Sequence, residues 1–222
     1  FKGVVIANEV LDAIPAKRIT FSKGSFVELG VDFQNGSFQW QKFSHPFADL
    51  RIATPNISEE GYCTEINLQS NAWIKSLYDQ ISQGTVLLID YGMTRSEYYH
   101  PQRNDGTLKC FFNHKAGDDP FCNIGNQDIT TSVNFSDIAE SAVEAGFKLS
   151  GYCTQAMFLI SLGIENYLSV KKNDQDRNKT SQEIKRLVLP GAMGEVFKVM
   201  ALSKKQTVKL DGFNEQNLID RL

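Results

Sequence analysis

Residues 3–15 read GVVIANEVLDAIP, and this stretch decides the fold class. Its first five residues form an unbroken apolar run with β-branched side chains, which is typical of a strand buried on both faces of a parallel sheet. Asn8 and Glu9 follow the run directly. Because open parallel sheets bind ligands outside the carboxyl ends of their strands, the stretch predicts a buried strand that carries polar residues to such an edge.

A second strand of the same kind is predicted at Thr85–Gly92, which reads TVLLIDYG. Before it, the apolar residues of Leu68–Ile81 recur at helical spacing, and Gly84 ends that segment. A helix, a glycine and an apolar strand in succession indicate the alternation of an α/β protein.

The stretch Lys17–Phe43 has a different pattern, with alternating polar and apolar residues. Ser25–Gly30 and Gly36–Phe43 are predicted to be the two strands of a hairpin, with Asn35-Gly36 as its turn. We interpret residues 17–57 as an antiparallel insertion, and Ser58 as a residue that could open a helix.

Residues 93–131 are long, irregular and rich in Gly, Asn, Asp and Pro, as in a functional or mobile loop. After this loop, residues 134–136 are predicted to cap a helix at Asp137–Ala145, which Gly146 ends. Downstream we expect the following elements: a strand at Phe147–Thr154, a helix at Gln155–Val170, a polar surface connection at Lys171–Thr180, a last strand at Met193–Leu202 and a polar tail over residues 203–222.

The composition excludes several classes of protein. The formal net charge of the 222 residues is -3 and no long basic run occurs, which weighs against nucleic acid as a partner. No apolar stretch reaches the roughly 18 residues of a membrane span. The four cysteines form no C-x-x-C pair and the three histidines are scattered, so no metal site is expected and the thiols are predicted to be reduced. P-loop, G-x-S-x-G and G-x-G patterns are all absent.

Glu9 and Asp12 are the first candidates for chemistry. If a helical turn follows the strand, two carboxylates three residues apart lie on one side of it and could hold a cation, ideally a guanidinium. The alternative is a helix start, where acidic residues interact favourably with the helix dipole. Asp90, Tyr91 and Gly92 end the second strand and form another candidate group. A third group, Gln127 and Asp128, lies in the long loop, which could close over a site as a lid.

Five collinear segments resemble the MidA family. They are ANEVLDAIP (7–15), LLIDYG (87–92), the stretch 106–135, GYCTQAMFLISLG (151–163) and LVLPGAMGEVFKVMAL (187–202). The family's mitochondrial members methylate arginine on a core subunit of respiratory complex I. The family loop often reads D-[IL]-T-A-H-V-D-F, whereas this chain has Ser132 in place of the histidine and Asn134 in place of the aspartate.

The resemblance implies the C-terminal portion (residues 1–202) of a seven-stranded, Rossmann-like class I methyltransferase fold, with the hairpin as an insertion. Residues 3–7 and 86–90 would be its fourth and fifth strands. The family's glycine-rich cofactor motif lies upstream of the fourth strand, so we expect the chain to be a truncated piece. The function implied is methyl transfer from S-adenosylmethionine to a protein arginine, in the cytoplasm or the mitochondrial matrix.

The resemblance also implies roles for individual residues. Glu9 and Asp12 would be catalytic, and Ala7 and Asn8 would line the cofactor site. The acceptor would be bound by Asn8, Asp90, Tyr91, Gly92, Gln127 and Asp128. The implied partners are a protein substrate, with a complex I subunit as one candidate, and a second copy of the chain in a homodimer. Two alternatives are open: a non-catalytic assembly chaperone on the same scaffold, and a chain that is inert by itself.

Overall fold

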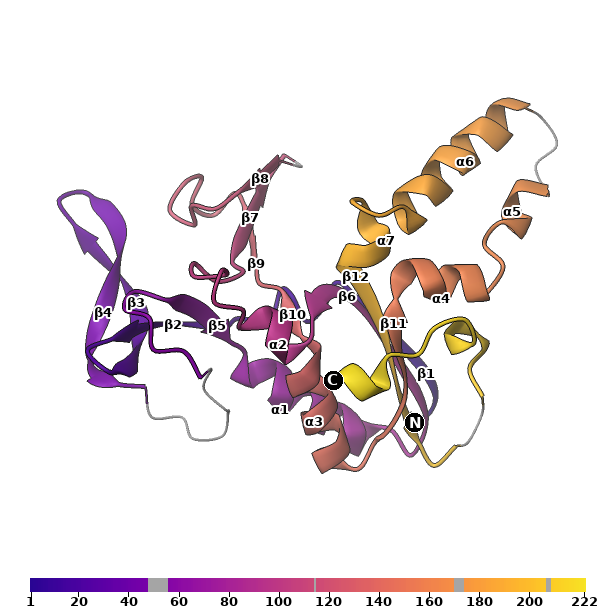
Figure 1. Ribbon diagram of the computed structural model, residues 1–222, viewed down its shortest axis with the longest axis horizontal. Helices are drawn as coiled ribbons and strands as arrows, with labels where there is room; N and C mark the ends of the chain where they lie inside the picture. Colours follow the sequence, from indigo (N-terminus) through magenta and orange to yellow (C-terminus); the bar gives the residue numbers. More distant parts are fainter. Residues whose placement is uncertain (48–55, 114, 170–173, 207–208) are drawn as a thin grey trace. The chain divides into compact units, whose positions relative to one another are not determined.

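The computed structural model describes residues 1–47, 56–113, 115–169, 174–206 and 209–222. The chain forms two compact units. The first, which we call the sheet unit, contains Phe1–Leu11, Asn71–Thr94 and Val133–Leu222. The second, the hairpin unit, contains Asp12–Ser70 and Arg95–Ser132. Figure 1 shows the elements of each unit.

The sheet unit is built on a mixed sheet with the strand order β1-β6-β12-β11. Strand β1 runs parallel to β6, while β12 runs antiparallel to both of its neighbours, β6 and β11. The short strand β10 pairs with the end of β6. These results confirm the two strands predicted first and the α/β class. The bounds are Lys2–Asn8 for β1, Gln83–Met93 for β6, Val133–Asn134 for β10, Lys148–Thr154 for β11 and Phe197–Lys204 for β12.

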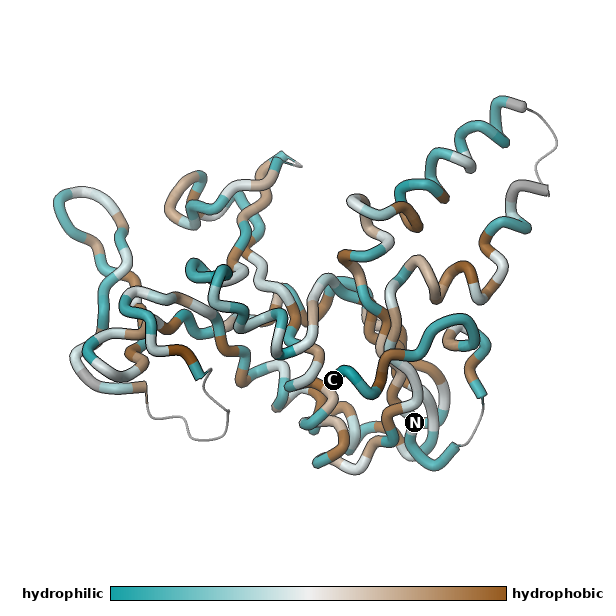
Figure 2. The backbone as a smooth tube through the Cα atoms, in the orientation of Figure 1, coloured by the Kyte–Doolittle hydropathy of each residue, from teal (hydrophilic) through white to brown (hydrophobic). Residues whose placement is uncertain are grey.

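Burial differs sharply between the strands of this sheet. The side chains of Val86 and Leu88 on β6 are fully buried, and most of β12 is buried as well. On β1, by contrast, Val4 is 63% exposed and Ile6 is 66% exposed. The expectation that residues 3–7 are buried on both faces is therefore wrong for this chain, because no other described part of the chain covers the face that carries Val4 and Ile6, whereas Ala7 on the opposite face is buried. Figure 2 shows the hydropathy along each strand.

Helices α1 (Leu68–Gln80) and α3 (Phe135–Ala145) confirm two predicted helices. The side chain of Asn134 caps α3 by accepting a hydrogen bond from the backbone N–H of Asp137. At the other end Gly146 has a φ of 106°, a left-handed conformation that suits glycine, and its N–H bonds back to the last turn. Both ends of α3 are thus fixed by local residues that the sequence displays.

Three boundaries differ from the prediction. The helix expected at 155–170 is split into α4 (Gln155–Ser161) and α5 (Asn166–Ser169), with Gly163 at a positive φ between them. The expected surface connection at 171–180 enters α6 (Asp174–Val188), although residues 170–173 lie outside the described part of the chain. The last strand begins only at Phe197, because Met193–Val196 form the short helix α7.

The C-terminal residues lie along the outer edge of β11. They include two short 3-10 helices, η1 (Asp211–Phe213) and η2 (Ile219–Arg221). The N–H of Leu218 donates to the carbonyl of Tyr152 at 2.6 Å, and the side chain of Gln216 accepts from the N–H of Thr154 at 3.0 Å. These bonds satisfy backbone groups that an edge strand would otherwise expose.

The hairpin unit contains a second sheet, with the strand order β4-β3-β2-β5. Its turn lies between β3 and β4, where Asn35 has a φ of 51° and Gly36 a φ of 80°. Two successive positive φ values match a type I′ turn, which confirms the predicted hairpin. No helix begins at Ser58, and the segment leads into β5 instead. The bounds are Lys17–Ser22 for β2, Ser25–Gln34 for β3, Ser37–Pro46 for β4 and Cys63–Ile66 for β5.

Residues 95–132 of this unit are more regular than the sequence indicated. They include the short helix α2 (Arg95–Tyr98) and a small antiparallel sheet with the order β8-β7-β9. The strands are β7 (Lys109–Phe112), β8 (Lys115–Gly117) and β9 (Asp128–Thr130). Strands of three or four residues are too short to show an alternating pattern, so they could not be predicted from periodicity.

Candidate functional site

The carboxyl ends of β1 and β6 lie next to each other in the sheet unit. Asn8 pairs with Ile89, and the N–H of Glu9 donates to the carbonyl of Ile89 at 2.9 Å, which extends the ladder by one bond. Glu9 then adopts a φ of 50°, a left-handed conformation that is uncommon for residues other than glycine. Such strained positions cluster at active sites and ligand clamps, so Glu9 is a candidate on its backbone conformation as well as its charge.

The side chains of Asn8 and Glu9 are both exposed and touch each other. The amide nitrogen of Asn8 donates to Oε1 of Glu9 at 3.3 Å. Ala7, the residue before them, is buried. An exposed carboxylate with one oxygen oriented by a neighbouring amide can accept hydrogen bonds from a cationic ligand.

Asp90 is only 1% exposed, and both of its carboxylate oxygens accept backbone hydrogen bonds. Oδ2 accepts from the N–H of Leu11 at 3.0 Å, and Oδ1 accepts from the N–H of Tyr91 at 2.9 Å. The first bond joins the end of β6 to the segment that follows β1. Asp90 therefore holds Leu11, two residues after Glu9, and so positions the segment that carries Glu9.

Tyr91 and Gly92 complete the end of β6. The ring of Tyr91 is half-buried and meets the ring of Phe197 edge to face, with 5.7 Å between the centroids. At Gly92 a Cβ atom would lie 2.2 Å from the carbonyl oxygen of Val133. Only glycine allows β10 to pair with β6 this closely, which accounts for the glycine at this position.

Asp12, Gln127 and Asp128 belong to the hairpin unit. Asp12 is 5% exposed and lies in a turn, and its backbone carbonyl accepts from the N–H of Thr131 at 3.0 Å. No helix begins after β1, so the interpretation of Glu9 and Asp12 as a helix start is wrong, and the helical turn that would place both carboxylates on one side is not formed either. The side chain of Gln127 donates to the carbonyl of Asp119 at 3.1 Å, and Asp128 is exposed at the start of β9. The catalytic role predicted for Asp12 and the acceptor-binding roles predicted for Gln127 and Asp128 stay predictions.

A buried ion pair in the hairpin unit was missed by the sequence reasoning. Glu65 on β5 is 1% exposed and lies 3.8 Å from a guanidinium nitrogen of Arg18, the residue opposite it on β2. Its Oε2 also accepts from the N–H of Thr107 at 2.6 Å and from the hydroxyl of Thr107 at 3.0 Å. Burial raises the pKa of this carboxyl, while the bonds to Thr107 and the charge of Arg18 oppose that shift.

The Arg18 guanidinium has further contacts. Its carbon lies 5.1 Å from the centroid of the Trp40 ring, and it also bonds to Asp105. The network thus joins the larger sheet of the hairpin unit to the segment that precedes β7. In the sequence, Arg18 and Glu65 are a single arginine and a single glutamate in strands of alternating polar and apolar residues. Nothing there distinguishes them from surface charges.

Other kinds of site find little support. No group of three or more metal-ligating side chains occurs within the described ranges. Burial raises the pKa of Cys153 to about 12, so this thiol stays protonated and is a poor nucleophile. Within the same described ranges, no helix has the length and apolar character needed to cross a membrane.

Comparison with solved structures finds two close matches from Burkholderia thailandensis. The first, a native crystal structure of an uncharacterized protein, is 37% identical with a TM-score of 0.93. The second, a "likely methyl transferase" bound to S-adenosyl-homocysteine, is 35% identical with a TM-score of 0.92. Each match covers 100% of this chain but only 60% and 58% of the respective relatives. The chain therefore spans about three fifths of their length.

Comparison with curated proteins gave no match. Comparison with family models gave one, to a family described as "Putative S-adenosyl-L-methionine-dependent methyltransferase", over residues 1–153. Because this match covers more than two thirds of the 222 residues, the chain belongs to that methyltransferase family.

Proposed function

We propose that this chain is the acceptor-binding part of a methyltransferase that moves a methyl group from S-adenosylmethionine to a protein arginine, as in the MidA family. The observation that carries the proposal is the exposed carboxylate of Glu9, fixed at the carboxyl end of β1 in a member of this family. A carboxylate can hold a guanidinium through two hydrogen bonds and orient its nitrogen.

The strand order supports a Rossmann-like seven-stranded sheet in the whole protein. The order β1-β6-β12-β11, with β12 antiparallel, would be one half of such a sheet. The free edge of β1 and the exposed side chains of Val4 and Ile6 offer a place for the other half. The greater length of both solved relatives is consistent with this arrangement. The antiparallel sheet of the hairpin unit would then be an insertion.

The residues present fit only one edge of a cofactor site. Ala7 is small and buried, and the amide of Asn8 is exposed at the strand end, so these two residues would border S-adenosylmethionine, which supplies an electrophilic methyl group when bound. The glycine-rich turn expected for such a cofactor has no counterpart among the 222 residues. The cofactor would therefore be held mainly by residues outside this chain.

The roles of the chain's own residues follow from their contacts. Glu9 would accept hydrogen bonds from the acceptor guanidinium, and Asn8 would orient the carboxylate. Asp90 would keep the following segment in place through the N–H of Leu11. These groups act by positioning a nucleophilic nitrogen and by stabilising its positive charge. Asp12, Gln127 and Asp128 are proposed as further acceptor contacts, together with Tyr91 and Gly92.

The test is Glu9→Gln in the full-length protein. With radiolabelled S-adenosylmethionine and an arginine-containing protein substrate, methylation should fall by at least tenfold while cofactor affinity is retained. Glu144→Gln is the matched control, because Glu144 is an exposed carboxylate on α3 of the sheet unit and is distant in sequence from Glu9. Unchanged turnover in Glu9→Gln would remove Glu9 from the mechanism, and label on lysine would refute the arginine assignment.

A protein-binding role is the second candidate, and one observation favours it. Val31 and Phe33 on β3 and Phe38 on β4 are exposed, and their alternation places them on one face of the hairpin. The Trp40 ring lies on the same face. Exposed apolar patches of this kind mark protein interfaces, either with a client protein or with a second copy of the chain. Sedimentation of the Phe33→Ser/Phe38→Ser variant would distinguish them: a homodimer dissociates, whereas a client-binding monomer does not change.

A further inference from the structure

A hollow of about 240 Å³ lies at the opposite end of the sheet unit from Glu9 and Asp90. It is lined by residues 148–150 at the start of β11 and, from the C-terminal part of the chain, by Gln206 and by residues between 209 and 217. Lys148 pairs with Ser203 at this end of the sheet, whereas Asp90 pairs with Lys198 at the other. Ser203 lies five residue steps along the extended strand from Lys198, which is roughly 17 Å at about 3.4 Å per residue.

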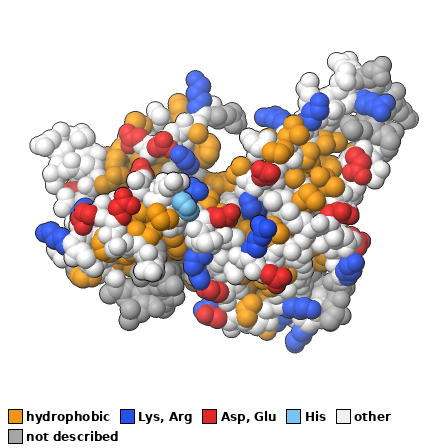
Figure 3. All heavy atoms as spheres, in the orientation of Figure 1, with side chains coloured by type: hydrophobic (Ala, Val, Ile, Leu, Met, Phe, Trp, Pro, Cys, Tyr) orange, Lys and Arg blue, Asp and Glu red, His pale blue; other side chains and the backbone are white. Residues whose placement is uncertain are grey.

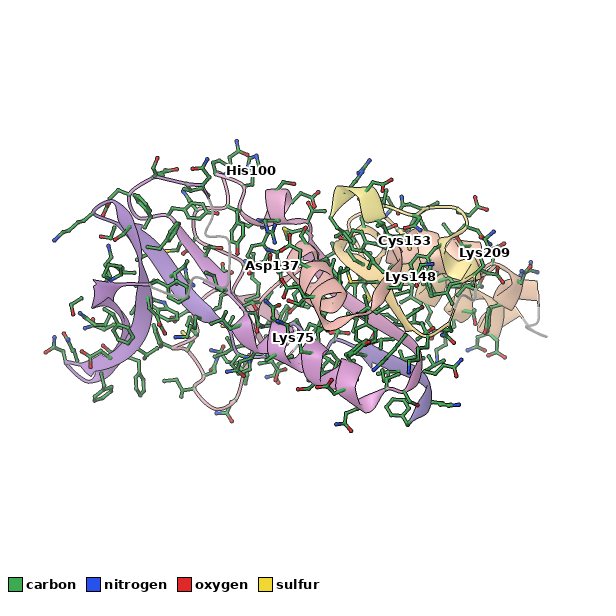
Figure 4. The ribbon with its side chains drawn as sticks, turned by 90° about the horizontal axis from the view of Figure 1, so that it is seen from below. Lys75, His100, Asp137, Lys148, Cys153 and Lys209 are labelled. Atoms are coloured by element: carbon green, nitrogen blue, oxygen red, sulfur yellow. The ribbon has the colours of Figure 1, made fainter. Side chains whose placement is uncertain are left out.

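The charged side chains among the described lining residues are all positive. Lys148 and Lys209 are among the lining residues, and none of the described lining residues is acidic. Within the described ranges, neither ammonium group has a hydrogen-bond or ion-pair partner. Figure 4 shows both lysines beside the C-terminal segment of the sheet unit. Two cationic side chains without a partner among the described residues favour an anionic ligand in this hollow.

The floor of the hollow is apolar and firmly held. Phe213 is buried, and its ring meets that of Phe158 edge to face at 5.3 Å. On the other side, a Cβ on Gly151 would lie 2.4 Å from the Phe213 ring, so the ring rests directly on the backbone of β11. Leu149 and Leu210 also line the hollow. These three side chains form the apolar part of a mixed lining, on which an apolar group of a ligand can rest.

Two polar side chains of the lining, Asn217 and Ser150, are oriented by their own hydrogen bonds. Oδ1 of Asn217 accepts from the N–H of Tyr152 at 3.2 Å, which leaves its amide nitrogen as a donor. The hydroxyl of Ser150 bonds to the hydroxyl of Ser203 at 2.8 Å. The hollow is smaller than the ~300–1,000 Å³ typical of pockets for drug-sized ligands, so its occupant has to be small.

From these observations we propose that the hollow binds a small organic anion, in which a carboxylate or phosphate group lies between Lys148 and Lys209 and an apolar group rests on Phe213. The site is separate from the strand ends that hold Asn8 and Glu9. It does not depend on the proposed methyl transfer, and a ligand here would act as a regulator or stabiliser of the sheet unit.

The test is NMR titration of the chain with four probes at low salt: phenyl phosphate, benzoate, inorganic phosphate and benzyl alcohol. The two amphiphilic anions should give saturable shifts at Ser150 and Asn217, with at least tenfold higher affinity than inorganic phosphate or the neutral alcohol. Higher salt should weaken both, because the lysines are at an open rim. No saturable shift, or equal affinity for all four probes, would overturn the proposal.

Variants test the lysines directly. Lys148→Gln/Lys209→Gln should lower the affinity for phenyl phosphate at least tenfold, whereas Lys148→Arg/Lys209→Arg should keep most of it. Lys115→Gln removes an equivalent exposed charge from the hairpin unit and should leave the affinity unchanged. Unaltered shifts outside the hollow would show that the double variant is folded. Equal binding by the folded double glutamine variant would refute the role of the lysines.

Discussion

Asp90→Asn provides a direct test of how the candidate site is held together. The buried carboxylate accepts hydrogen bonds from the N–H groups of Leu11 and Tyr91 at 3.0 and 2.9 Å. A hydrogen bond to a charged group contributes about 1.5–3 kcal/mol. Asparagine keeps one acceptor oxygen and presents an NH₂ group to the other N–H. The substitution should therefore remove one of the two bonds and cost about 1.5–3 kcal/mol.

The bond to Leu11 is the one that should weaken, because Tyr91 is adjacent in sequence and can keep the remaining oxygen. Since each 1.36 kcal/mol is a factor of ten, the opening equilibrium at Leu11 should rise about 13-fold to 160-fold. Amide hydrogen exchange of Leu11, followed by NMR, measures this. Asp79→Asn is the control, because Asp79 is an exposed carboxylate of the same unit. If Leu11 exchanges equally slowly in Asp90→Asn and the wild type, Asp90 does not hold this segment.

Single contacts at Gly92, Cys122 and Glu65 can each be tested by one substitution. Gly92→Ala should lower the free energy of unfolding by about 1–3 kcal/mol in urea, because its Cβ would overlap the carbonyl of Val133; an unchanged midpoint would contradict this close approach. The hydrogen bond to Asp119 raises the pKa of the Cys122 thiol. Asp119→Asn should therefore speed alkylation of Cys122 by iodoacetamide at pH 8 severalfold. Equal rates would show that the bond is not formed in solution. Burial raises the pKa of Glu65, so its contribution to stability is fully present below about pH 4.5 and is lost as the pH rises through the folded-state pKa. Glu65→Gln should therefore flatten this part of the curve of unfolding free energy between pH 4 and 8. An unaltered curve would refute the shift.

The parts of the fold that could be predicted are those set by local residues. The apolar run of β6, the capped helix α3 and the Asn35-Gly36 turn each carry their own signal within a few residues. Helix α6 could not be predicted in this way, because its first turns are almost wholly polar and its apolar residues occur only near its end. Its sequence is equally typical of a surface connection.

Surface exposure is a second property that the sequence could not supply. Strand β1 is apolar like the buried β6, and what separates them is that no other described part of the chain covers the face of β1 that carries Val4 and Ile6. A similar ambiguity holds for the apolar residues over α4, α6 and α7, where Figure 3 shows hydrophobic side chains gathered at the surface. Ile160, Leu162 and Val196 are each exposed there. Composition indicates that a segment can be buried, but only tertiary neighbours bury it.

The two carboxylates at the strand ends differ in a way that strand periodicity explains. On β6 the even-numbered residues are buried, so Asp90 shares the inner face with Leu88 and has to find its hydrogen-bond partners inside the protein. Glu9 lies just beyond β1, where its left-handed φ breaks the alternation that buries Ala7 and leaves the carboxylate exposed. A carboxylate whose two oxygens are both engaged by backbone N–H groups has little capacity left for a ligand, whereas an exposed one keeps most of it. For the proposed methyl transfer, this contrast assigns the contact with the acceptor to Glu9 and its positioning to Asp90.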